Sequence, residues 1–235
     1  MNEKTTQDLF DHAERDFPRE CCGVVIVVRG KERYMACRNT ADSNEHFIIH
    51  PEDYAAAEDL GEITAIAHSH CNLPPLPSQP DLIGCEKSGK PWVIVSWPTR
   101  QIHTFEPTGY NAPLVGREFH HGVLDCYALC RDYYKETLGI ELPDPDREYE
   151  WWLKGQNLYL DHFEEIGFVR VDPATMRKHD GILMQAASPV PNHAAVYLGD
   201  NLILQHVMNR LSSRDVYGGW YRKCTVAVIR HKDHM

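Results

Sequence analysis

The chain has 235 residues, which at roughly 100 to 200 residues per domain makes either one large domain or two small ones. Its 43% hydrophobic and 25% charged residues are ordinary for a globular protein, which excludes a disordered chain or a disulfide-stapled miniprotein. The formal net charge of −10 disfavours a nucleic-acid partner, because proteins that bind phosphate backbones usually carry a basic face.

Targeting signals are not expected either. The first fifteen residues are polar and lack the apolar centre of a secretion signal, and no window approaches the roughly 18 apolar residues that a membrane span needs. The eight cysteines include an adjacent pair, Cys21 and Cys22. Without a secretion signal, this pattern favours reduced thiols in a cytoplasm over a disulfide framework.

The first half alternates short strand-like runs with helical ones. Apolar periodicity and turn residues predict helices over 7–17, 51–60 and from Ser78 onward, and strands over 23–29, 33–38, 45–50, 63–68, 92–97 and 101–106. Pro51 would open its helix at the first position, where no hydrogen bond is lost. These elements predict an α/β or α+β domain over residues 1–106.

A linker is predicted at residues 107–116, which carry two prolines and two glycines and no charge. Beyond it, helices are predicted over 125–138 and about 156–166, with Gly139 as the C-terminal cap of the first. Strands follow over 181–184, 193–198, 202–207 and 225–230. Helices first and antiparallel strands after them predict an α+β domain over 117–235.

The sharpest motif of the first half is His68-Ser69-His70, followed by Ser78 and Asp81. Two histidines two positions apart at the end of a strand point to the same side, so both imidazoles can meet one ion. Asp81, at the start of the next helix, would be the third ligand. Three protein ligands plus a water are typical of a catalytic zinc site. Ser78 would then hydrogen-bond the developing oxyanion.

The serine and the aspartate also have a second interpretation. Ser78-x-x-Asp81 is a helix-start pattern, in which Ser78 is the N-cap and the helix dipole favours Asp81, and this explains both residues without a metal. In a chain with 14 histidines, one His-x-His pair can also arise by chance. Both interpretations stay open.

The complete motif resembles the signature of the JAMM metallopeptidases, also called MPN-type. The resemblance covers about the first 105 residues and implies an α/β domain with a mixed sheet and a bound zinc. It also implies an upstream glutamate as general base, which here is Glu20, just before the first strand. The spacing alone does not choose Glu20 over Glu45 or Glu62. Cys71 departs from the family pattern, in which many members have proline.

A second constellation is centred on Cys126, which is expected at the N-terminal end of its helix. Unpaired backbone N–H groups there favour the thiolate and lower the thiol pKa. If Gly199 and Asp200 form a two-residue turn, His193 faces His206 across the hairpin. His206 would then hold the ring of His193 while His193 activates Cys126.

Alternatives to this triad also stay open. Cys126 and Cys130, one helical turn apart, can be small buried hydrophobes, and opposed histidines can form a surface pair. A three-residue turn through Asn201 would break the register on which the pairing depends.

The segments around Cys126, over 181–184 and from His193 to Gly199 resemble the NlpC family of papain-like cysteine peptidases. The resemblance covers about residues 117–235 and implies a papain-like α+β domain with an antiparallel sheet. It makes Cys126 the nucleophile, His193 the base and His206 the third polar residue. Where many members have Ser-Gly after the cysteine, this chain has Tyr127-Ala128, as in a phage-tail branch of the family.

The two modules in this order, together with an aromatic run at 151–159, resemble the tail tip assembly proteins of lambda-like phages. The run is expected to pack in the core or wall the cleft. The resemblance implies a hydrolase with zinc as cofactor that cuts peptidoglycan peptides, at D-glutamyl and diaminopimelyl bonds through the NlpC-like half and at isopeptide bonds through the JAMM-like half. The expected partners are those peptides and other tail tip proteins.

The expected location is the host bacterial cytoplasm during tail assembly, or the tail tip of the virion. The rival hypothesis is a non-catalytic assembly or docking protein that uses peptidase folds as scaffolds, since a fold does not establish a function. A metal-storing or redox protein ranks last, because the sequence contains no Cys-x-x-Cys pair.

Overall fold

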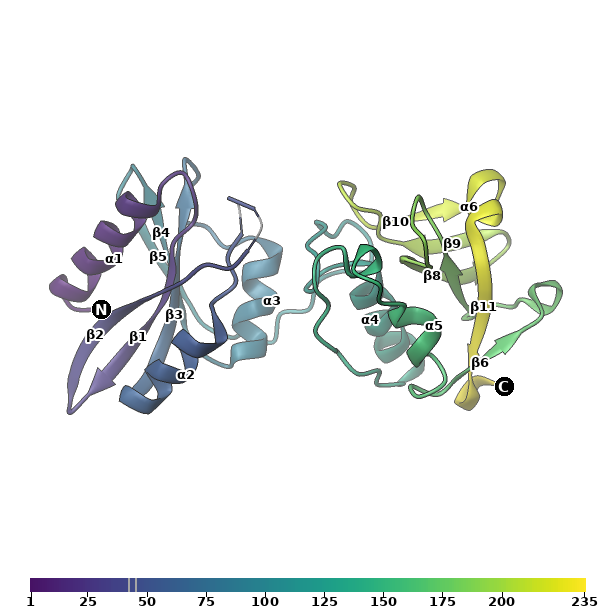
Figure 1. Cartoon of the computed structure of the whole chain (residues 1–235), viewed down its shortest axis with the longest axis horizontal. Helices are drawn as coiled ribbons and strands as arrows, with labels where there is room; N and C mark the ends of the chain where they lie inside the picture. Colours follow the sequence, from purple (N-terminus) through teal and green to yellow (C-terminus); the bar gives the residue numbers. More distant parts are fainter. Residues whose placement is uncertain (42, 45) are drawn as a thin grey trace. The chain divides into compact units, whose positions relative to one another are not determined.

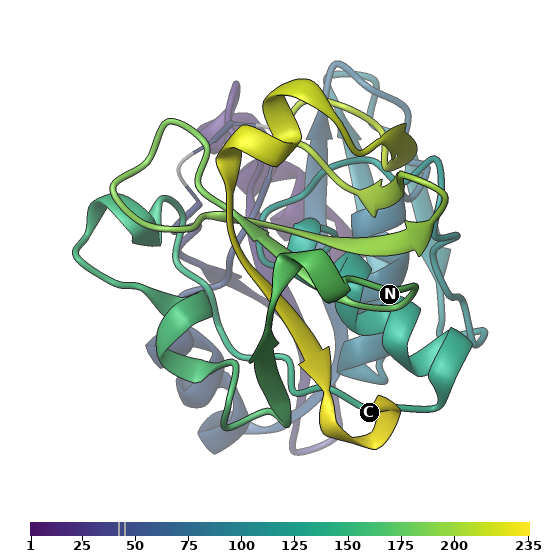
Figure 2. The same cartoon turned by 90° about the vertical axis from the view of Figure 1, so that its right-hand side faces the viewer.

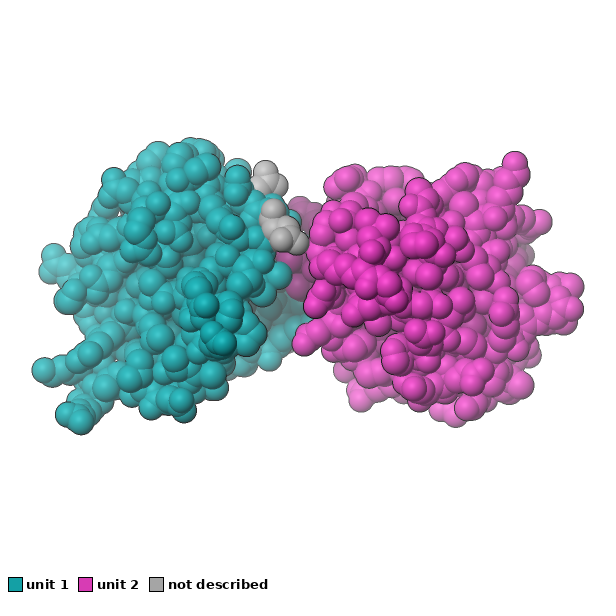
Figure 3. Space-filling model, in the orientation of Figure 1, with its two compact units in different colours: residues 1–111 teal, residues 112–235 magenta. Residues whose placement is uncertain are grey.

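The chain divides into two compact units (Figure 3), and each unit contains its own β-sheet. This computed structural model describes residues 1–41, 43–44 and 46–235, with unit 1 over Met1–Asn111 and unit 2 over Ala112–Met235. The boundary falls within the segment predicted as a linker. Both units mix helices with strands, so the predicted α+β class is correct. No helix among the described residues is long and apolar enough to cross a bilayer.

The sheet of unit 1 has the strand order β2-β1-β3-β4-β5. β3 and β4 run parallel and the other neighbours antiparallel, so the predicted mixed sheet is correct. The elements of this unit are α1 (Glu3–Asp16), β1 (Cys22–Val28), β2 (Lys31–Cys37), α2 (Pro51–Leu60), β3 (Glu62–Cys71), α3 (Gln79–Ser88), β4 (Trp92–Trp97) and β5 (Ile102–Phe105).

Helices cover both faces of this sheet, with α1 on one side and α2 and α3 on the other (Figure 1). Leu9 and Phe10 of α1 share one core with Val95 of β4, whereas Ala57 of α2 and Cys85 of α3 belong to the core on the opposite face. Because β3 lies in the middle of the sheet and is packed from both faces, the position of its last residues is firmly fixed.

The strand predicted over 45–50 is wrong for its described part, and Glu45 lies outside the described residues. In residues 46–50, only Ile49 makes a β-bridge, an isolated one with Asn39, and no continuous strand pairing forms. The side chain of Asn39 takes up the backbone groups that a strand partner would bind: its Oδ1 accepts from the N–H of Ile48, and its Nδ2 donates to the carbonyl of His46. Side-chain hydrogen bonds of this kind favour a loop over a sheet.

Gly23 in β1 occupies a position with no room for a side chain. A Cβ there would lie 2.4 Å from the carbonyl oxygen of Met35 and 2.5 Å from the hydroxyl of Tyr34. We therefore expect Gly23→Ala to destabilise the chain by about 1–3 kcal/mol, because the β1–β2 pairing has to shift. Urea unfolding measures this. Gly218→Ala is the matched control, since its Cβ would meet only Val216 at 4.0 Å, and an equal loss in both variants would contradict the steric argument.

The sheet of unit 2 has the order β10-β9-β8-β7-β11-β6, and every neighbouring pair is antiparallel, as predicted. In Figure 2 the yellow strand β11 crosses the yellow-green strands at a steep angle, which shows the twist of this sheet. The elements are α4 (Cys126–Leu138), α5 (Leu158–His162), β6 (Phe168–Val171), β7 (Gly181–Met184), β8 (His193–Gly199), β9 (Leu202–Gln205), β10 (Ser213–Val216), α6 (Gly219–Cys224), β11 (Thr225–His231) and the short 3-10 turns Trp151–Leu153, Pro173–Thr175 and Lys232–His234.

Helix α4 packs on one face of this sheet and sets the position of Cys126. Leu129 and Tyr133 of α4 share a core with Val196 of β8. The Asp125 side chain caps the start of the helix by accepting the N–H of Ala128, and Gly139 ends it in the left-handed conformation. Cys126 is therefore the first residue of a helix held at both ends.

Candidate functional site

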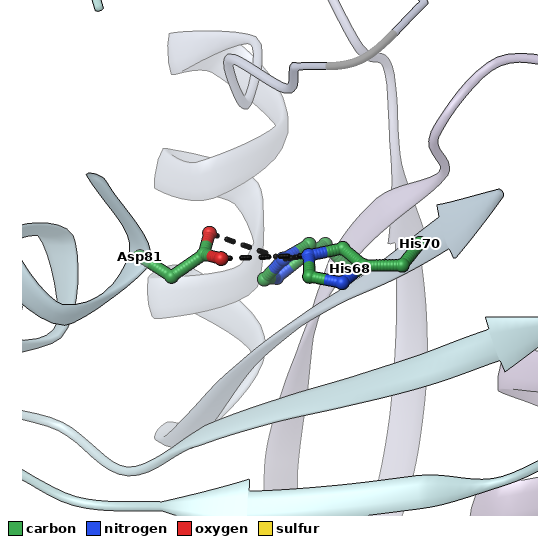
Figure 4. A group of neighbouring side chains, drawn as sticks. All are labelled: His68, His70 and Asp81. Carbon is green, nitrogen blue, oxygen red and sulfur yellow. Dashed lines mark hydrogen bonds and ion pairs between the residues drawn. The ribbon is translucent and has the colours of Figure 1, made fainter. Parts of the chain in front are cut away.

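The three predicted metal ligands come together at the end of β3. His68 and His70 lie on this strand, Asp81 lies in the first turn of α3, and all three are buried. One ligand atom from each lies within 4.8 Å of the other two (Figure 4). The carboxylate of Asp81 and both imidazoles point at a common centre.

The spacing of the ligand atoms fits a small tetrahedral ion. Nε2 of His68 lies 3.3 Å from Nε2 of His70 and 3.2 Å from Oδ1 of Asp81, and Nε2 of His70 lies 3.4 Å from Oδ2 of Asp81. Two atoms that bind a tetrahedral zinc at about 2.0–2.1 Å are about 3.3–3.4 Å apart. Imidazole nitrogens and a carboxylate oxygen are also ligands that zinc prefers. The residues present therefore fit a zinc ion.

Hydrogen bonds orient the ring of His70 for this role. Its Nδ1 lies 2.9 Å from the carbonyl oxygen of Pro74. A carbonyl only accepts, so Nδ1 carries the proton and Nε2 faces the cluster. Burial lowers the pKa of His70, but the hydrogen bonds to Asp81 and Pro74 outweigh burial and raise it overall. Burial lowers the pKa of His68, whose ring stacks on Phe47 with 4.4 Å between centroids.

Ser78 forms a capping box with Asp81, as the alternative interpretation required. The backbone N–H of Ser78 donates to Oδ2 of Asp81 at 2.8 Å, and its hydroxyl donates to the same oxygen at 2.7 Å. In return, Ser78 Oγ accepts the N–H of Asp81 at 3.3 Å. The same carboxylate also belongs to the histidine cluster, so helix capping and metal ligation are compatible here. The cap therefore orients the Asp81 carboxylate.

Glu20 lies buried just before β1, beside the cluster. Cys22, two residues further on, pairs with His68 across β1 and β3, and the N–H of Cys21 donates to Ser69 Oγ at 2.9 Å. The negative charge of Glu20 also raises the pKa of His70, although its effect is smaller than those of burial and of the hydrogen bonds described above. The carboxylate of Glu20 therefore acts electrostatically on His70, and its role as general base stays a prediction.

The other two glutamates are poorer candidates for this base. Glu62 begins β3 and so lies at the end of the strand away from the histidines. Glu45 lies outside the described residues. Cys71 ends β3 next to His70, and burial raises the pKa of its thiol.

The pKa of the Cys126 thiol is higher than the sequence predicts. Burial raises its pKa to about 11, and the charge of Asp125 adds to this effect. The expected lowering by the helix N-terminus is therefore wrong, because burial outweighs the partial charge of the backbone N–H groups. The Sγ atom lies 3.2 Å from the hydroxyl of Tyr159, which can donate to a thiolate.

The predicted pairing of His193 with His206 is wrong by one residue. Asp200 and Asn201, both with positive φ, form the hairpin turn, and Gly199 pairs with Leu202. A bulge near Gly199 then brings Ala195 opposite Gln205. As a result, Nε2 of His193 lies 3.0 Å from Oε1 of the fully buried Gln205.

Gln205 therefore takes the position that sequence reasoning gave to His206. The Asp-Asn dipeptide could have located the turn, since both residues tolerate the positive φ that a type I′ turn requires at its two central positions. Finding Gln205 also requires the bulge near Gly199, which changes the face that this residue occupies. His206 is fully buried, and neither of its ring nitrogens has a hydrogen-bond partner in the described part of the chain. Its ring meets that of Phe119 edge-on at 5.1 Å. It does not hold the ring of His193.

We expect the stability of unit 2 to fall as the pH drops from about 6.5 to about 4. The pKa of His206 is lowered to about 4, mainly by burial, with a smaller contribution in the same direction from the charge of Arg117 and an opposing one from the charge of Asp125. The unfolded ring binds a proton below about 6.5, so protons favour the unfolded state across this window, by about 1.4 kcal/mol per pH unit. Urea unfolding across the window measures this. His206→Phe should flatten the dependence, and an unchanged slope in that variant would assign it to other groups.

Cys126 and His193 line the same cleft, which has a volume of about 210 Å³. Aromatic residues wall it, among them Trp151, Trp152 and Trp220. Trp151 is almost fully buried and also packs against Tyr159, so the aromatic run serves both the core and the cleft, as predicted. This cleft offers a thiol, an imidazole and room for a small substituent.

The fold and the two sites define a chain that joins a JAB-type domain to an NlpC/P60-type domain. Residues 2–107 match the family model of prokaryotic homologs of the JAB domain, and residues 116–230 match the NlpC/P60 family. The chain is 41% identical over 236 residues to tail tip assembly protein K of Escherichia phage N15, covering 99% of this chain and 96% of that protein. It belongs to the family of tail tip assembly protein K.

Other known proteins are also similar. Tail tip assembly protein K of Escherichia phage lambda is 42% identical over 182 residues, covering 77% of this chain and 88% of that protein. Among solved structures, an NlpC/P60 family protein from Bacillus cereus ATCC 10987 is 14% identical, with a TM-score of 0.37, over 96% of this chain and 66% of that one.

Proposed function

We propose that unit 2 is a cysteine peptidase that cuts the peptide part of bacterial peptidoglycan. The observation that carries this proposal is the cleft that contains the Cys126 thiol together with His193, whose ring is bonded to Gln205. Membership of the NlpC/P60 family supports D-glutamyl and diaminopimelyl bonds as the target. The roles of nucleophile, base and orienting residue then belong to Cys126, His193 and Gln205.

The hydrogen bonds of His193 and Cys126 support one route for the proton. Nε2 of His193 is bonded to the Gln205 carbonyl, so the other ring nitrogen, Nδ1, accepts the proton from the thiol of Cys126. The hydroxyl of Tyr159 then donates to the thiolate and stabilises it. The sulfur attacks the amide carbon, His193 returns the proton to the departing amine, and water hydrolyses the acyl-enzyme.

Unit 1 is proposed to be a zinc-dependent peptidase for isopeptide bonds, with His68, His70 and Asp81 holding the ion. A zinc ion held by these residues would supply Lewis-acid activation of a water molecule and of the amide carbonyl. Glu20 takes a proton from the attacking water and passes it to the leaving amine. Ser78 donates its single hydroxyl hydrogen to Asp81 and so orients this carboxylate. To hydrogen-bond the oxyanion, this hydroxyl would have to turn from Asp81 to the substrate.

The family name gives the setting in which these activities would act. A tail tip assembly protein has other phage tail tip proteins as partners, and peptidoglycan is the barrier that a tail tip meets. The chain would work in the host cytoplasm while tails assemble, or at the tail tip of the virion. The net charge of −10 favours protein partners over nucleic acid.

Mass spectrometry of peptidoglycan fragments tests the proposal. Purified fragments are incubated with the full chain in the presence of zinc, and with Cys126→Ala and His68→Ala in parallel. We expect the wild type to shorten the stem peptides, with one set of products missing in each variant. Intact stems after incubation with the wild type would overturn the peptidase proposal for this substrate. Loss in Cys126→Ala alone would assign all cleavage to unit 2.

The second candidate function is a non-catalytic assembly or docking protein. The raised pKa of the Cys126 thiol favours it, because a thiol that stays protonated is a poor nucleophile. In that case the wild type and both variants leave the peptidoglycan fragments intact. Cys126→Ala also still supports tail assembly when it replaces the wild type in an infected cell.

A further inference from the structure

Asp215 lies next to the His193–Gln205 pair, on the edge strand of the sheet. Its Oδ2 atom accepts from Nε2 of Gln205 at 2.6 Å. The same oxygen is 3.1 Å from the hydroxyl of Ser213 and 3.4 Å from that of Tyr221, and both donate to it. The carboxylate is thus held in place from its own strand and from α6.

This contact fixes the orientation of the Gln205 amide. A carboxylate oxygen only accepts, so the NH₂ end of the amide has to face Asp215. The carbonyl end then faces His193 and lies 3.0 Å from Nε2. Gln205 is fully buried, so bulk water does not reach the amide to replace either bond.

The orientation of the amide in turn decides where the proton of the imidazole sits. A carbonyl only accepts, so Nε2 of His193 carries the hydrogen and Nδ1 is left as the basic nitrogen. A reversed amide would present its NH₂ group to Nε2 and favour a hydrogen on Nδ1. A ring in that form has no free lone pair for the thiol proton of Cys126.

We propose that Asp215 is a positioning residue, which fixes the tautomer of His193 through Gln205. The inference rests on the proposed function only for its consequence, namely that Nδ1 serves as the base for Cys126. The tautomer itself is a property of the resting protein and can be observed without any substrate.

The test compares Asp215→Asn with the wild type in the full chain. Its first readout is the tautomer of His193, followed by the ¹⁵N chemical shifts of ring-labelled histidine. We expect Nε2–H in the wild type and a shift toward Nδ1–H in the variant, because an asparagine NH₂ group can face the amide and release its orientation. The second readout is the alkylation rate of Cys126 by iodoacetamide, resolved by peptide mass spectrometry, which should fall at least about tenfold.

Two further variants separate positioning from a merely structural role. Ser213→Ala removes another partner of Asp215 and leaves the Gln205 bond in place, so both readouts should stay as in the wild type. Adding Gln205→Glu to Asp215→Asn puts an acceptor-only group next to Nε2 of His193, so the Nε2–H form should return. A structural defect would not be repaired in this way. If Asp215→Asn does not fold, Asp215→Ser provides the same comparison.

The outcomes are distinguishable from failure of the proposed function. An unchanged His193 tautomer in folded Asp215→Asn would overturn the positioning role and leave the peptidase proposal standing. If Cys126 in the wild type reacts no faster than the buried Cys130, the thiol is not activated and the proposed function fails, whatever the tautomer.

Discussion

Cys126→Ala is expected to lower kcat for stem-peptide cleavage by unit 2 at least about 10⁴-fold, with KM little changed. The thiol is the group that would form the acyl-enzyme, and no other cysteine lines the cleft in the described part of the chain. Substrate binding depends instead on the cleft walls, including Trp152 and Trp220, which the substitution leaves intact. Initial rates on a synthetic stem peptide, followed by mass spectrometry, measure the loss.

Cys130→Ala is the matched control for this prediction. Cys130 lies one turn further along α4, is buried like Cys126, and also has a raised thiol pKa because of burial. Cys130→Ala also removes one sulfur atom from a buried side chain, but it leaves the cleft unchanged. The value of kcat should therefore stay within about threefold of the wild type. Equal losses in the two variants would mean that helix packing, not the nucleophile, limits the rate.

Elements marked by strong local signals were predictable from the sequence. Helix α2 begins at Pro51 and ends at Leu60 as predicted, because proline at the first position and the following glycine bound it on both sides. The buried runs that form β4 and β7 were also predicted with their observed bounds. Each of these signals lies within the element or directly beside it.

Elements that depend on distant partners were not predictable in this way. Strands β6 and β10 are four residues long, and polar side chains interrupt them, so periodicity does not reveal them. The helix predicted over 156–166 is limited to α5, Leu158–His162. At the N-terminus, α1 starts at Glu3 instead of the predicted Gln7, because Asn2 caps it by accepting the N–H of Thr5.

The same distinction between local signals and distant partners applies to the candidate sites. His68, His70 and Asp81 were predictable as a group because strand alternation and a capping pattern operate over a few residues. The partner of His193 was not, since the bulge near Gly199, added to the shifted turn, places Gln205 instead of His206 on the face of His193. The direction of the thiol pKa also requires the folded structure, because burial is set by segments that pack around the helix end.

The chain purified with zinc is expected to hold one ion in unit 1, and His68→Gln is expected to bind zinc at least about 100-fold more weakly. Loss of an outer-shell partner of a metal ligand alone costs about 10–100-fold in affinity, and His68 would be a direct ligand. A competition titration against a chromogenic chelator measures the affinity. Elemental analysis of the dialysed protein gives the number of ions per chain.

Three further variants show whether the motif is more than a helix cap. His103→Gln, on β5 outside the cluster, should bind zinc like the wild type. Ser78→Ala removes the hydroxyl that orients Asp81, so a loss of about 10–100-fold is expected. Asp81→Asn keeps an oxygen that accepts the N–H of Ser78, so the helix start survives while a charged ligand is lost.

At a free zinc concentration 100 times Kd, the wild type should gain about 2.7 kcal/mol of stability and His68→Gln almost none. If zinc neither binds nor stabilises the wild type, Ser78 and Asp81 serve only as a cap, and the zinc-peptidase role of unit 1 is lost.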